Sequence, residues 1–396
     1  MSAYALNEQQ QMLADSARHY LRQRSVAGSG VAVAGRSGDE PQRWSEMAEL
    51  GWLAMPLPEP FGGLGGSMAD VCALTEELGN SGATEPYIAS AVLAGMLLAD
   101  IAPDCMRKEW LPALASGARR LALAAWEPGA RFDWTQVTTQ ALQRGTAWRL
   151  SGSKVMVLGG PGAQALVVSA CIADRSDLGL FLLPADGLGQ RLVAKTLFDG
   201  QQAAELTMDQ AEGAVLLCRG ERAGILNHLE RAIERAALAH CADTVGAMAR
   251  AFDLTRDYLG TRSQFGKTLA TNQVIQHRLV DLYVEIEEAR ALIRKTASLF
   301  DNADIETASE RRRYVAAVKA FTAQAARHVW EESVQLHGAI GMTQECAVGA
   351  FVKRLALAVS LYGDEAFHLQ RVASVSLDGA ALAARLPQET ASVPAC

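Results

Sequence analysis

Arg262-Ser263-Gln264-Phe265-Gly266-Lys267, followed by Gln273, lies in a part of this 396-residue sequence where long helix-compatible segments predominate, from about Ile225 onward. Downstream of the stretch, apolar residues recur every three or four positions, which is the spacing of one buried helical face: Leu279, Leu282, Ile286, Ala289 and Ile293. A further helical pattern runs from about Ser309 to His337. The last third of the chain is therefore predicted to be helical.

Two other zones precede this region. Residues 1–120 carry a helix start signal at Leu6-Asn7-Glu8 and later apolar runs with a helical period, and they enclose a Pro- and Gly-rich segment, 56–66, that we expect to be an ordered loop. Residues 121–225 contain short β-type runs, with Ser151-Gly152-Ser153 as the predicted turn of a hairpin. We therefore predict a helical domain (1–120), a β domain (121–225), a helical bundle (226–386) and a frayed tail (387–396).

Composition excludes several classes of protein. Lys and Arg total 37 against 44 Asp and Glu, a net charge of −7, and this argues against nucleic acid or an anionic membrane as the main partner. The start of the chain lacks a secretory signal, and no stretch is predicted to span a membrane, so we expect a cytoplasmic protein. The seven cysteines form no CxxC pair and the histidines no metal-binding spacing, so no metal is expected.

Short motifs then point to a family. The stretch Arg262–Lys267 with Gln273 matches R-x-x-F-G-K-x5-Q, and Val334–Thr343 resembles Q-[IL]-[FH]-G-G-x-G-[YM]-T. Upstream, Gly62-Gly63-Leu64-Gly65 resembles part of an amino-terminal consensus, and Trp126-Glu127-Pro128 resembles a T-E-P loop. These are motifs of the acyl-CoA dehydrogenase family, in the right order along nearly the whole chain. The sequence is most similar to diverged bacterial members that work as paired large and small subunits, including pimeloyl-CoA dehydrogenase small subunits.

The resemblance implies an α+β fold with a helical amino-terminal domain, a central β-barrel-like domain and a carboxyl-terminal four-helix bundle. It also implies an FAD enzyme that oxidises an acyl-CoA to a trans-2-enoyl-CoA, with a carboxylate removing the alpha proton and hydride passing to flavin N5. The expected partners are an electron-transfer flavoprotein as electron acceptor and a second subunit, identical or related.

The same resemblance implies a set of cofactor contacts. Arg262 offers a charge-assisted fork for the FAD pyrophosphate, usually across a dimer interface. Phe265 can lie against an aromatic ring of the cofactor, and glutamine amides and a glycine can approach its adenosine part. The FAD-binding residues implied are Arg262, Phe265, Gln273, Gln335, Gly338 and Trp126. One departure concerns the flavin edge, where the family often has a threonine and this chain reads Val155-Met156-Val157-Leu158.

The catalytic base is harder to place. The family's Y-E-G-T motif corresponds to Tyr362-Gly363-Asp364-Glu365, so alignment on the tyrosine puts Gly363 at the catalytic position, whereas alignment on Gln370-Arg371 puts Asp364 there. Asp364 is the first candidate and Glu365 the second. A minority of the family uses a glutamate on the helix before the Arg262 motif. This chain has Ala236 at that position. Glu234 lies two residues away, which is about 200° around the helix.

Two other functions remain open at this point. The chain could be a catalytically silent subunit that completes the FAD site of a partner, with Asp364 and Glu365 as a solvated pair at a helix start. It could also be a helical scaffold protein that binds no flavin.

Overall fold

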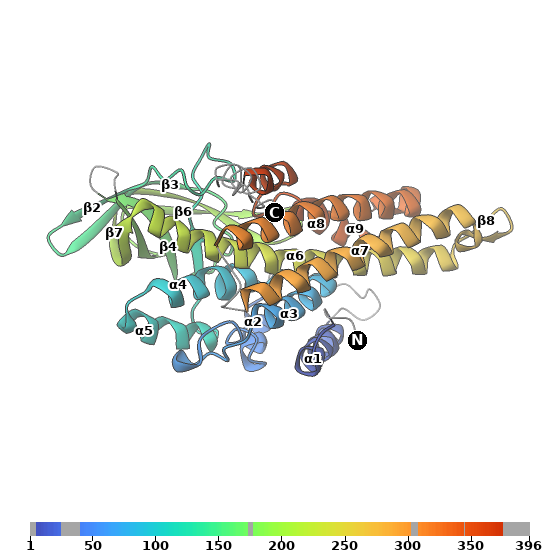
Figure 1. The fold of residues 1–396 in the computed structure, drawn as a ribbon, viewed down its shortest axis with the longest axis horizontal. Helices are drawn as coiled ribbons and strands as arrows, with labels where there is room; N and C mark the ends of the chain where they lie inside the picture. Colours follow the sequence, from blue (N-terminus) through green and yellow to red (C-terminus); the bar gives the residue numbers. More distant parts are fainter. Residues whose placement is uncertain (1–4, 25–39, 173–176, 302–307, 344, 375–396) are drawn as a thin grey trace, which may run out of the picture.

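The computed structural model describes residues 5–24, 40–172, 177–301, 308–343 and 345–374. Figure 1 shows strands gathered at one end of an elongated molecule and a long helical bundle that reaches to the other end. The helices before the strands are α1 (Glu8–Arg24), α2 (Glu40–Glu49), α3 (Met68–Ser81), α4 (Met96–Ile101) and α5 (Asp104–Ala115), with a 3-10 turn at Glu59–Phe61 and a π-helix at Ile88–Gly95.

The strands form one mixed sheet that closes on itself. They are β1 (Leu121–Ala124), β2 (Gln140–Arg144), β3 (Ala147–Lys154), β4 (Ala165–Ile172), β5 (Asp177–Pro184), β6 (Gln190–Thr196) and β7 (Gln202–Glu221). The pairing runs β4-β2-β3-β7-β5, and β5 also pairs with β4, which completes a barrel-like ring. Strand β1 is added alongside β4, and β6 alongside β7.

The bundle consists of α6 (Arg222–Thr261), α7 (Gln273–Phe300), α8 (Ala308–His337) and α9 (Val348–Ala358). Between α6 and α7 lie the short strands β8 (Ser263–Gln264) and β9 (Lys267–Thr268) and a 3-10 turn at Leu269–Thr271; another 3-10 turn, Gly338–Met342, follows α8. The predicted fold class, with a barrel-like centre and a four-helix bundle, is confirmed. The domain boundaries stay a prediction, and the predicted tail at 387–396 lies outside the described residues.

The predicted hairpin turn at Ser151-Gly152-Ser153 is wrong, because these residues lie inside β3. The hairpin instead turns at Gly145, between β2 and β3, where φ is +64°. Gly152 has a different reason to be glycine: a Cβ there would lie 2.7 Å from Oγ1 of Thr139, beside a register shift in the β3–β7 pairing. A Ser-Gly-Ser sequence reads as a turn, but here close packing requires the glycine.

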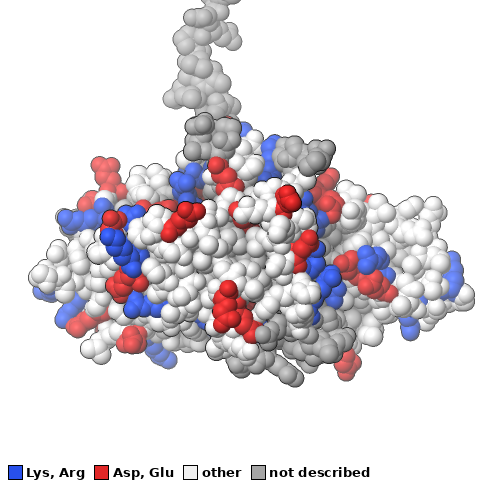
Figure 2. All heavy atoms as spheres, turned by 90° about the horizontal axis from the view of Figure 1, so that it is seen from below, with Lys and Arg blue, Asp and Glu red and all other residues white. Residues whose placement is uncertain are grey.

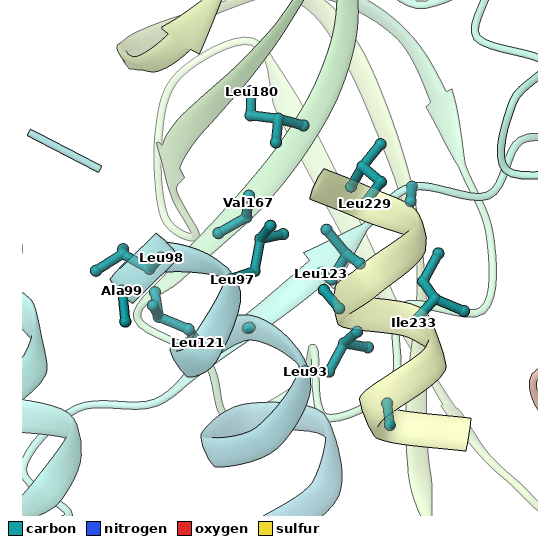
Figure 3. Close-up of a cluster of buried hydrophobic side chains, with 14 of the residues drawn as sticks. Leu93, Leu97, Leu98, Ala99, Leu121, Leu123, Val167, Leu180, Leu229 and Ile233 are labelled. Carbon is teal, nitrogen blue, oxygen red and sulfur yellow. The ribbon is translucent and has the colours of Figure 1, made fainter. Parts of the chain in front are cut away.

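One of the apolar clusters joins the sheet to the helices that precede it and to the bundle that follows it. Strands β1, β4 and β5 supply one side, and the π-helix with α4 and the start of α6 supply the others. Figure 3 draws part of this cluster, including Leu93, Leu97, Leu98, Leu121, Leu123, Val167, Leu180, Leu229 and Ile233. The sheet is therefore attached to both helical regions by buried apolar area.

On the face shown in Figure 2, acidic and basic side chains are interspersed, and no large patch carries charges of one sign. Within the described ranges, no helix is long and apolar enough to cross a membrane.

Helices α3 and α6 pack so closely that their backbones are in contact. Two glycines make this possible, because a Cβ on Gly79 would overlap the carbonyl group of Asp243, and a Cβ on Gly246 would overlap the carbonyl oxygen of Glu76. Neither glycine needs a positive φ, so close approach alone requires them. The contact sets the position of Asp243, whose side chain faces the cavity described below.

We expect Gly246→Ala to destabilise the protein by about 3 kcal/mol or more, because two backbones must separate to admit one methyl group. Gly260→Ala on the same helix is the matched control, since a Cβ there meets nothing within 4 Å. Removing a helical glycine there should cost nothing or stabilise by up to about 1 kcal/mol. Urea unfolding monitored by circular dichroism measures both, and equal stabilities of the two variants would contradict the proposed contact.

A buried ion pair joins the loop after β1 to the end of β3. Nζ of Lys154 lies 2.8 Å from Oε1 of Glu127, and both side chains are almost fully buried. The carboxylate also accepts hydrogen bonds from the backbone and hydroxyl groups of Thr138 and Thr139, and the ammonium donates to Ser169 at 3.0 Å. Burial alone would raise the pKa of Glu127, but Lys154 and these hydrogen bonds lower it to about 2.

Lys154→Met should cost about 3–5 kcal/mol, because it leaves a buried carboxylate without its cation, whereas Lys154→Met with Glu127→Gln should cost clearly less. The pair also predicts acid sensitivity. A depressed folded-state pKa stabilises the fold above the ordinary carboxyl pKa of 4.5, and this contribution is lost as the pH falls toward about 2. Urea titrations at neutral and acid pH test both points; a double variant as acid-sensitive as the wild type would argue against this assignment.

Candidate active site

Five of the six predicted cofactor residues gather at the tip of the helical bundle. Strands β8 and β9 form a hairpin with Phe265 and Gly266 at its turn, and the Phe265 side chain is 97% exposed. Arg262 directly follows α6, and Gln273 is the first residue of α7. Figure 1 places β8 at the end of the bundle that is remote from the sheet.

The second motif reaches the same tip. The rings of Tyr258, near the end of α6, and His337, at the end of α8, stack with their centroids 4.6 Å apart. Gln335 and Gly338 flank that histidine along the chain. Gly338 has φ +67°, and a Cβ on it would meet nothing within 4 Å, so an accessible backbone surface is available there. The structure thus brings together the two motifs that the sequence placed far apart.

The remaining predicted residues lie elsewhere. Trp126 follows β1, and its ring lies 6.4 Å from that of Tyr362, in an edge contact. Asp364 and Glu365 follow Tyr362 directly. At a rise of about 1.5 Å per residue, α6 alone extends about 33 Å between His240, whose ring lies 5.5 Å from Tyr362, and Arg262 at the tip. One copy of the chain therefore holds the two groups of predicted residues far apart.

Asp364 serves as the cap of the helical residues 365–374. Its Oδ1 accepts a hydrogen bond from the Phe367 backbone at 2.8 Å, and its Oδ2 lies 3.7 Å from the exposed guanidinium of Arg131. The Asp364 side chain is about one-third exposed. Glu365 lies 4.0 Å from Arg327 and is similarly exposed. Neither carboxylate lines the large cavity described below.

The turn that precedes Asp364 has little free space. Tyr362 has φ +60° and Gly363 φ +112°, and Nε2 of His368 lies 2.9 Å from the Tyr362 carbonyl oxygen. A Cβ at Gly363 would lie 2.6 Å from the rings of both Phe367 and His368. A side chain at the position directly after the tyrosine is therefore excluded in this conformation.

Glu234 lies on the other side of Tyr362, in a narrow space also bordered by Trp134 and His368. Its carboxylate pairs with Arg311 at 2.6 Å. Burial raises the pKa of Glu234 to about 6, although Arg311 opposes the rise. Its other oxygen lies 3.7 Å from Arg371 and has no hydrogen-bond partner among the described residues. Glu234 therefore has a raised pKa and lies between the guanidinium groups of Arg311 and Arg371.

A cavity of about 590 Å³ lies where the sheet, α3, α6 and α9 meet. The loops at 158–162 and 196–202 border it from the sheet side, and residues 83–89 border it from the side of the amino-terminal helices. Leu361 and Tyr362 form part of its wall. The turn that carries Tyr362 and Asp364 therefore borders this cavity through Leu361 and Tyr362.

Sequence reasoning missed His240, which lines this cavity and is 4% exposed. Burial lowers the pKa of His240 to about 3, with the charges of Lys319 and Arg354 adding to the effect, so the ring is neutral. One ring nitrogen donates to the carbonyl of Ala358, which also accepts from Lys319 at 3.0 Å. The other, Nε2, has no hydrogen-bond partner among the described residues. A single histidine among apolar residues forms no recognisable sequence motif, so only the tertiary structure shows that His240 lines the cavity.

The residues fit a flavin dinucleotide only in part. The tip offers an arginine, two glutamines, an aromatic ring and open glycine backbone, which suit a pyrophosphate and an adenosine. At the sheet, the Val155 amide donates to the Trp126 carbonyl and the Val157 amide to that of Ala204, and Leu158 lines the cavity in place of a hydroxyl. No group of three or more His, Cys, Asp or Glu residues in the described ranges is arranged to hold a metal ion.

The sequence matches two family models. Residues 7–118 match the acyl-CoA dehydrogenase N-terminal domain, and residues 224–377 match the acyl-CoA dehydrogenase C-terminal domain. Together the two matches cover more than half of the chain and flank the closed sheet on both sides.

Among known proteins, the acyl-CoA dehydrogenase fadE12 of Mycobacterium bovis is 28% identical over 80% of this chain and 82% of its own length. The probable acyl-CoA dehydrogenase YngJ of Bacillus subtilis is 25% identical over 87% of this chain and 92% of its own. Among solved structures, a variant of the Tcur3481-Tcur3483 steroid ACAD has a TM-score of 0.82 at 28% identity, covering 94% of this chain and 99% of that one. The ChsE4-ChsE5 complex of Mycobacterium tuberculosis shares the fold, with a TM-score of 0.81 at 21% identity over 99% and 100% of the two chains. This chain belongs to the acyl-CoA dehydrogenase family, a family of oxidoreductases.

Proposed function

We propose that this protein is an FAD-dependent acyl-CoA dehydrogenase that converts an acyl-CoA thioester into the trans-2-enoyl-CoA. The observation that carries the proposal is the cavity of about 590 Å³ between the sheet and the bundle, with the turn at Tyr362 in its wall. It is large enough for an acyl chain, and buried apolar and polar groups both line it. Reduced flavin would then pass electrons to an electron-transfer flavoprotein, in the cytoplasm.

The proposed cofactor site needs two chains. Arg262, Phe265, Gln273, Gln335 and Gly338 would hold the pyrophosphate and adenosine of FAD from the tip of one chain, while Trp126 would lie near the ring system bound by another. The separation of about 33 Å along α6 supports this division. The Tcur3481-Tcur3483 and ChsE4-ChsE5 names both denote pairs of different chains, which supports an oligomer with itself or with a related subunit.

Bound FAD supplies an acceptor for the hydride that leaves the beta carbon. The protein supplies the base and the surroundings of the substrate. An acyl-CoA that fills the cavity would displace water from it, which strengthens hydrogen bonds to the thioester oxygen and raises the basicity of a nearby carboxylate.

We propose Asp364 as the base and Glu365 as the second candidate. Asp364 lies two positions after Tyr362, which lines the cavity, and among the described residues its Oδ2 pairs only with Arg131, at 3.7 Å. To reach the alpha proton, the carboxylate would exchange its capping hydrogen bond from Phe367 for contact with the substrate. Glu234, with its pKa of about 6, is the alternative on α6, and it would first have to leave Arg311.

A second candidate function has support from a specific contact. The indole of Trp126 packs against Tyr362, and both side chains are less than 9% exposed, in the region where the family pattern has a small hydroxyl residue. Gly363 meanwhile leaves no room for a glutamate after the tyrosine. These features favour a silent subunit that keeps a complete tip and supplies it to the FAD site of a related catalytic chain.

The flavin content of the purified protein tests both candidates. We expect yellow protein whose flavin is bleached anaerobically by an acyl-CoA, and Arg262→Ala should lose most of the FAD because the pyrophosphate loses its bidentate cation. Arg256→Ala, which removes another exposed arginine near the end of α6, is the matched control and should keep the flavin. Flavin that appears only with a coexpressed related subunit, at one per pair of chains, would favour the silent-subunit function. Colourless protein under both conditions would refute both.

Asp364→Asn separates the role of the base from that of the helix cap. Asparagine caps helices as well as aspartate does, so folding and FAD content should be retained while the rate of anaerobic bleaching falls at least about 100-fold. Stopped-flow absorbance measures the rate. An unchanged rate would remove Asp364 as the base, and Glu365→Gln and Glu234→Gln would then be compared in the same assay.

A further inference from the structure

Two lysine side chains in the described ranges are completely buried, and only one of them has an ionic partner. Lys154 is 0% exposed and pairs with Glu127 at 2.8 Å. Lys319, on α8, is 2% exposed, and no carboxylate of the described residues forms an ion pair with it. Its Nζ donates a hydrogen bond of 3.0 Å to the carbonyl oxygen of Ala358. Burying an amine with so little compensation is costly, so stability does not explain why a lysine occupies this position.

The hydrogen bond from Lys319 is made to the end of α9. Ala358 is the last residue of this helix, and an α-helix leaves its final carbonyl groups without intrahelical partners. The ring of His240, on α6, donates to the same oxygen. Donors from two neighbouring helices, α6 and α8, therefore hold the end of α9.

The turn that carries the candidate base begins directly after this helix end. The Gly363 amide donates to the Ser360 carbonyl at 3.3 Å, which closes the chain into a tight turn. Further along, Nε2 of His368 donates to the Tyr362 carbonyl oxygen at 2.9 Å. The segment is thus held at both ends, by Lys319 before the turn and by a histidine ring after it.

Lys319 also lies within electrostatic reach of the turn. Burial lowers the pKa of Lys319, and the charges of Cys241 and Asp364 oppose this. Burial likewise lowers the pKa of His368 to about 3, and the charge of Lys319 adds to the effect. An amine and an ammonium both donate hydrogen bonds, so the contact with α9 persists in either protonation state of Lys319.

We propose that Lys319 is a positioning residue for the candidate base. Its hydrogen bond to the Ala358 carbonyl fixes the end of α9, and with it the turn that sets the position of Asp364 relative to the cavity. Lys319 is not among the residues that line the cavity, so it acts through the turn and not on the substrate. The inference rests on the proposed function, because it takes Asp364 as the base.

Lys319→Met separates positioning from stability. Methionine has a similar length but no donor, and the Ala358 carbonyl keeps its hydrogen bond from His240. Because an unpaired amine leaves the interior, we expect the midpoint of urea unfolding to be unchanged or higher and the FAD content to be retained. Lys154→Met is the matched comparison, since it breaks a buried ion pair, and its midpoint should fall.

Stopped-flow bleaching measures the effect on the base. The flavin-loaded protein, with its coexpressed partner if the flavin requires one, is mixed anaerobically with butanoyl-, octanoyl- or hexadecanoyl-CoA, whichever bleaches the wild type fastest. In Lys319→Met the limiting rate should fall at least about tenfold, because a small misplacement of a reacting group is costly. The acyl-CoA concentration that gives half of this rate should change less than about twofold.

Two further variants control this measurement. Lys319→Gln keeps an N–H donor on a shorter side chain and should recover part of the rate. Lys353→Met makes the same change at an exposed position of α9 and should keep the wild-type rate.

A double-mutant cycle shows whether Lys319 acts through the base. In the Asp364→Asn background, Lys319→Met should change the remaining rate less than about twofold, because effects of residues that act as a unit are not additive. An equal loss in both backgrounds would overturn the inference, since Lys319 would then support the site in general.

The remaining outcomes are also decisive. An unchanged rate in Lys319→Met, or a variant that fails to fold or loses its FAD, would overturn the inference while leaving the proposed function intact. A wild-type rate in Asp364→Asn would remove this base, and the inference with it. Failure of every acyl-CoA in a wider panel to bleach the wild type would instead remove the proposed function, together with the inference.

Discussion

The backbone contact between α3 and α6 is the constraint on which the cavity depends. At Gly79 and Gly246 the backbone of each helix touches a carbonyl group of the other, so a side chain at either position would force the two helices apart. This contact holds Asp243 against Arg354 of α9, and it places His240, one turn earlier on α6, at the cavity. The close contact at these two glycines thus determines where Asp243 and His240 lie.

Helix α6 also links the two ends of the molecule. Its first half packs against the sheet and the π-helix, its middle carries His240 and Asp243, and its end carries Arg262. Since a straight helix converts sequence separation into distance at about 1.5 Å per residue, the tip must lie far from the cavity of the same chain. Assembly with a second chain is the simple way for both to contribute to one extended ligand.

The turn at Tyr362 combines several unusual features in a short segment. Tyr362 and Gly363 both have positive φ, the Tyr362 carbonyl oxygen accepts a hydrogen bond from Nε2 of His368, and Asp364 caps the following helix. Strained backbone of this kind persists where the surroundings over-determine it, and it is found often at functional sites. The same turn borders the main cavity on one side and the Glu234 cluster on the other. A small change in this turn would therefore alter which carboxylate can approach a substrate.

The sequence by itself determined the family, the fold class and the helical register, because short motifs and apolar periodicity are local properties of the chain. It could place Arg262, Phe265 and Gln273 in one motif, but it could not decide between Asp364, Glu365 and Glu234, since a carboxylate becomes a base only through its burial and its neighbours. The pattern Ser151-Gly152-Ser153 wrongly predicted a turn, because Gly152 is required by the close packing of Thr139 and not by a change of chain direction. Only the tertiary structure decided that the buried Lys319 meets the end of α9, because hydrogen-bond partners and desolvation depend on residues that are distant in sequence.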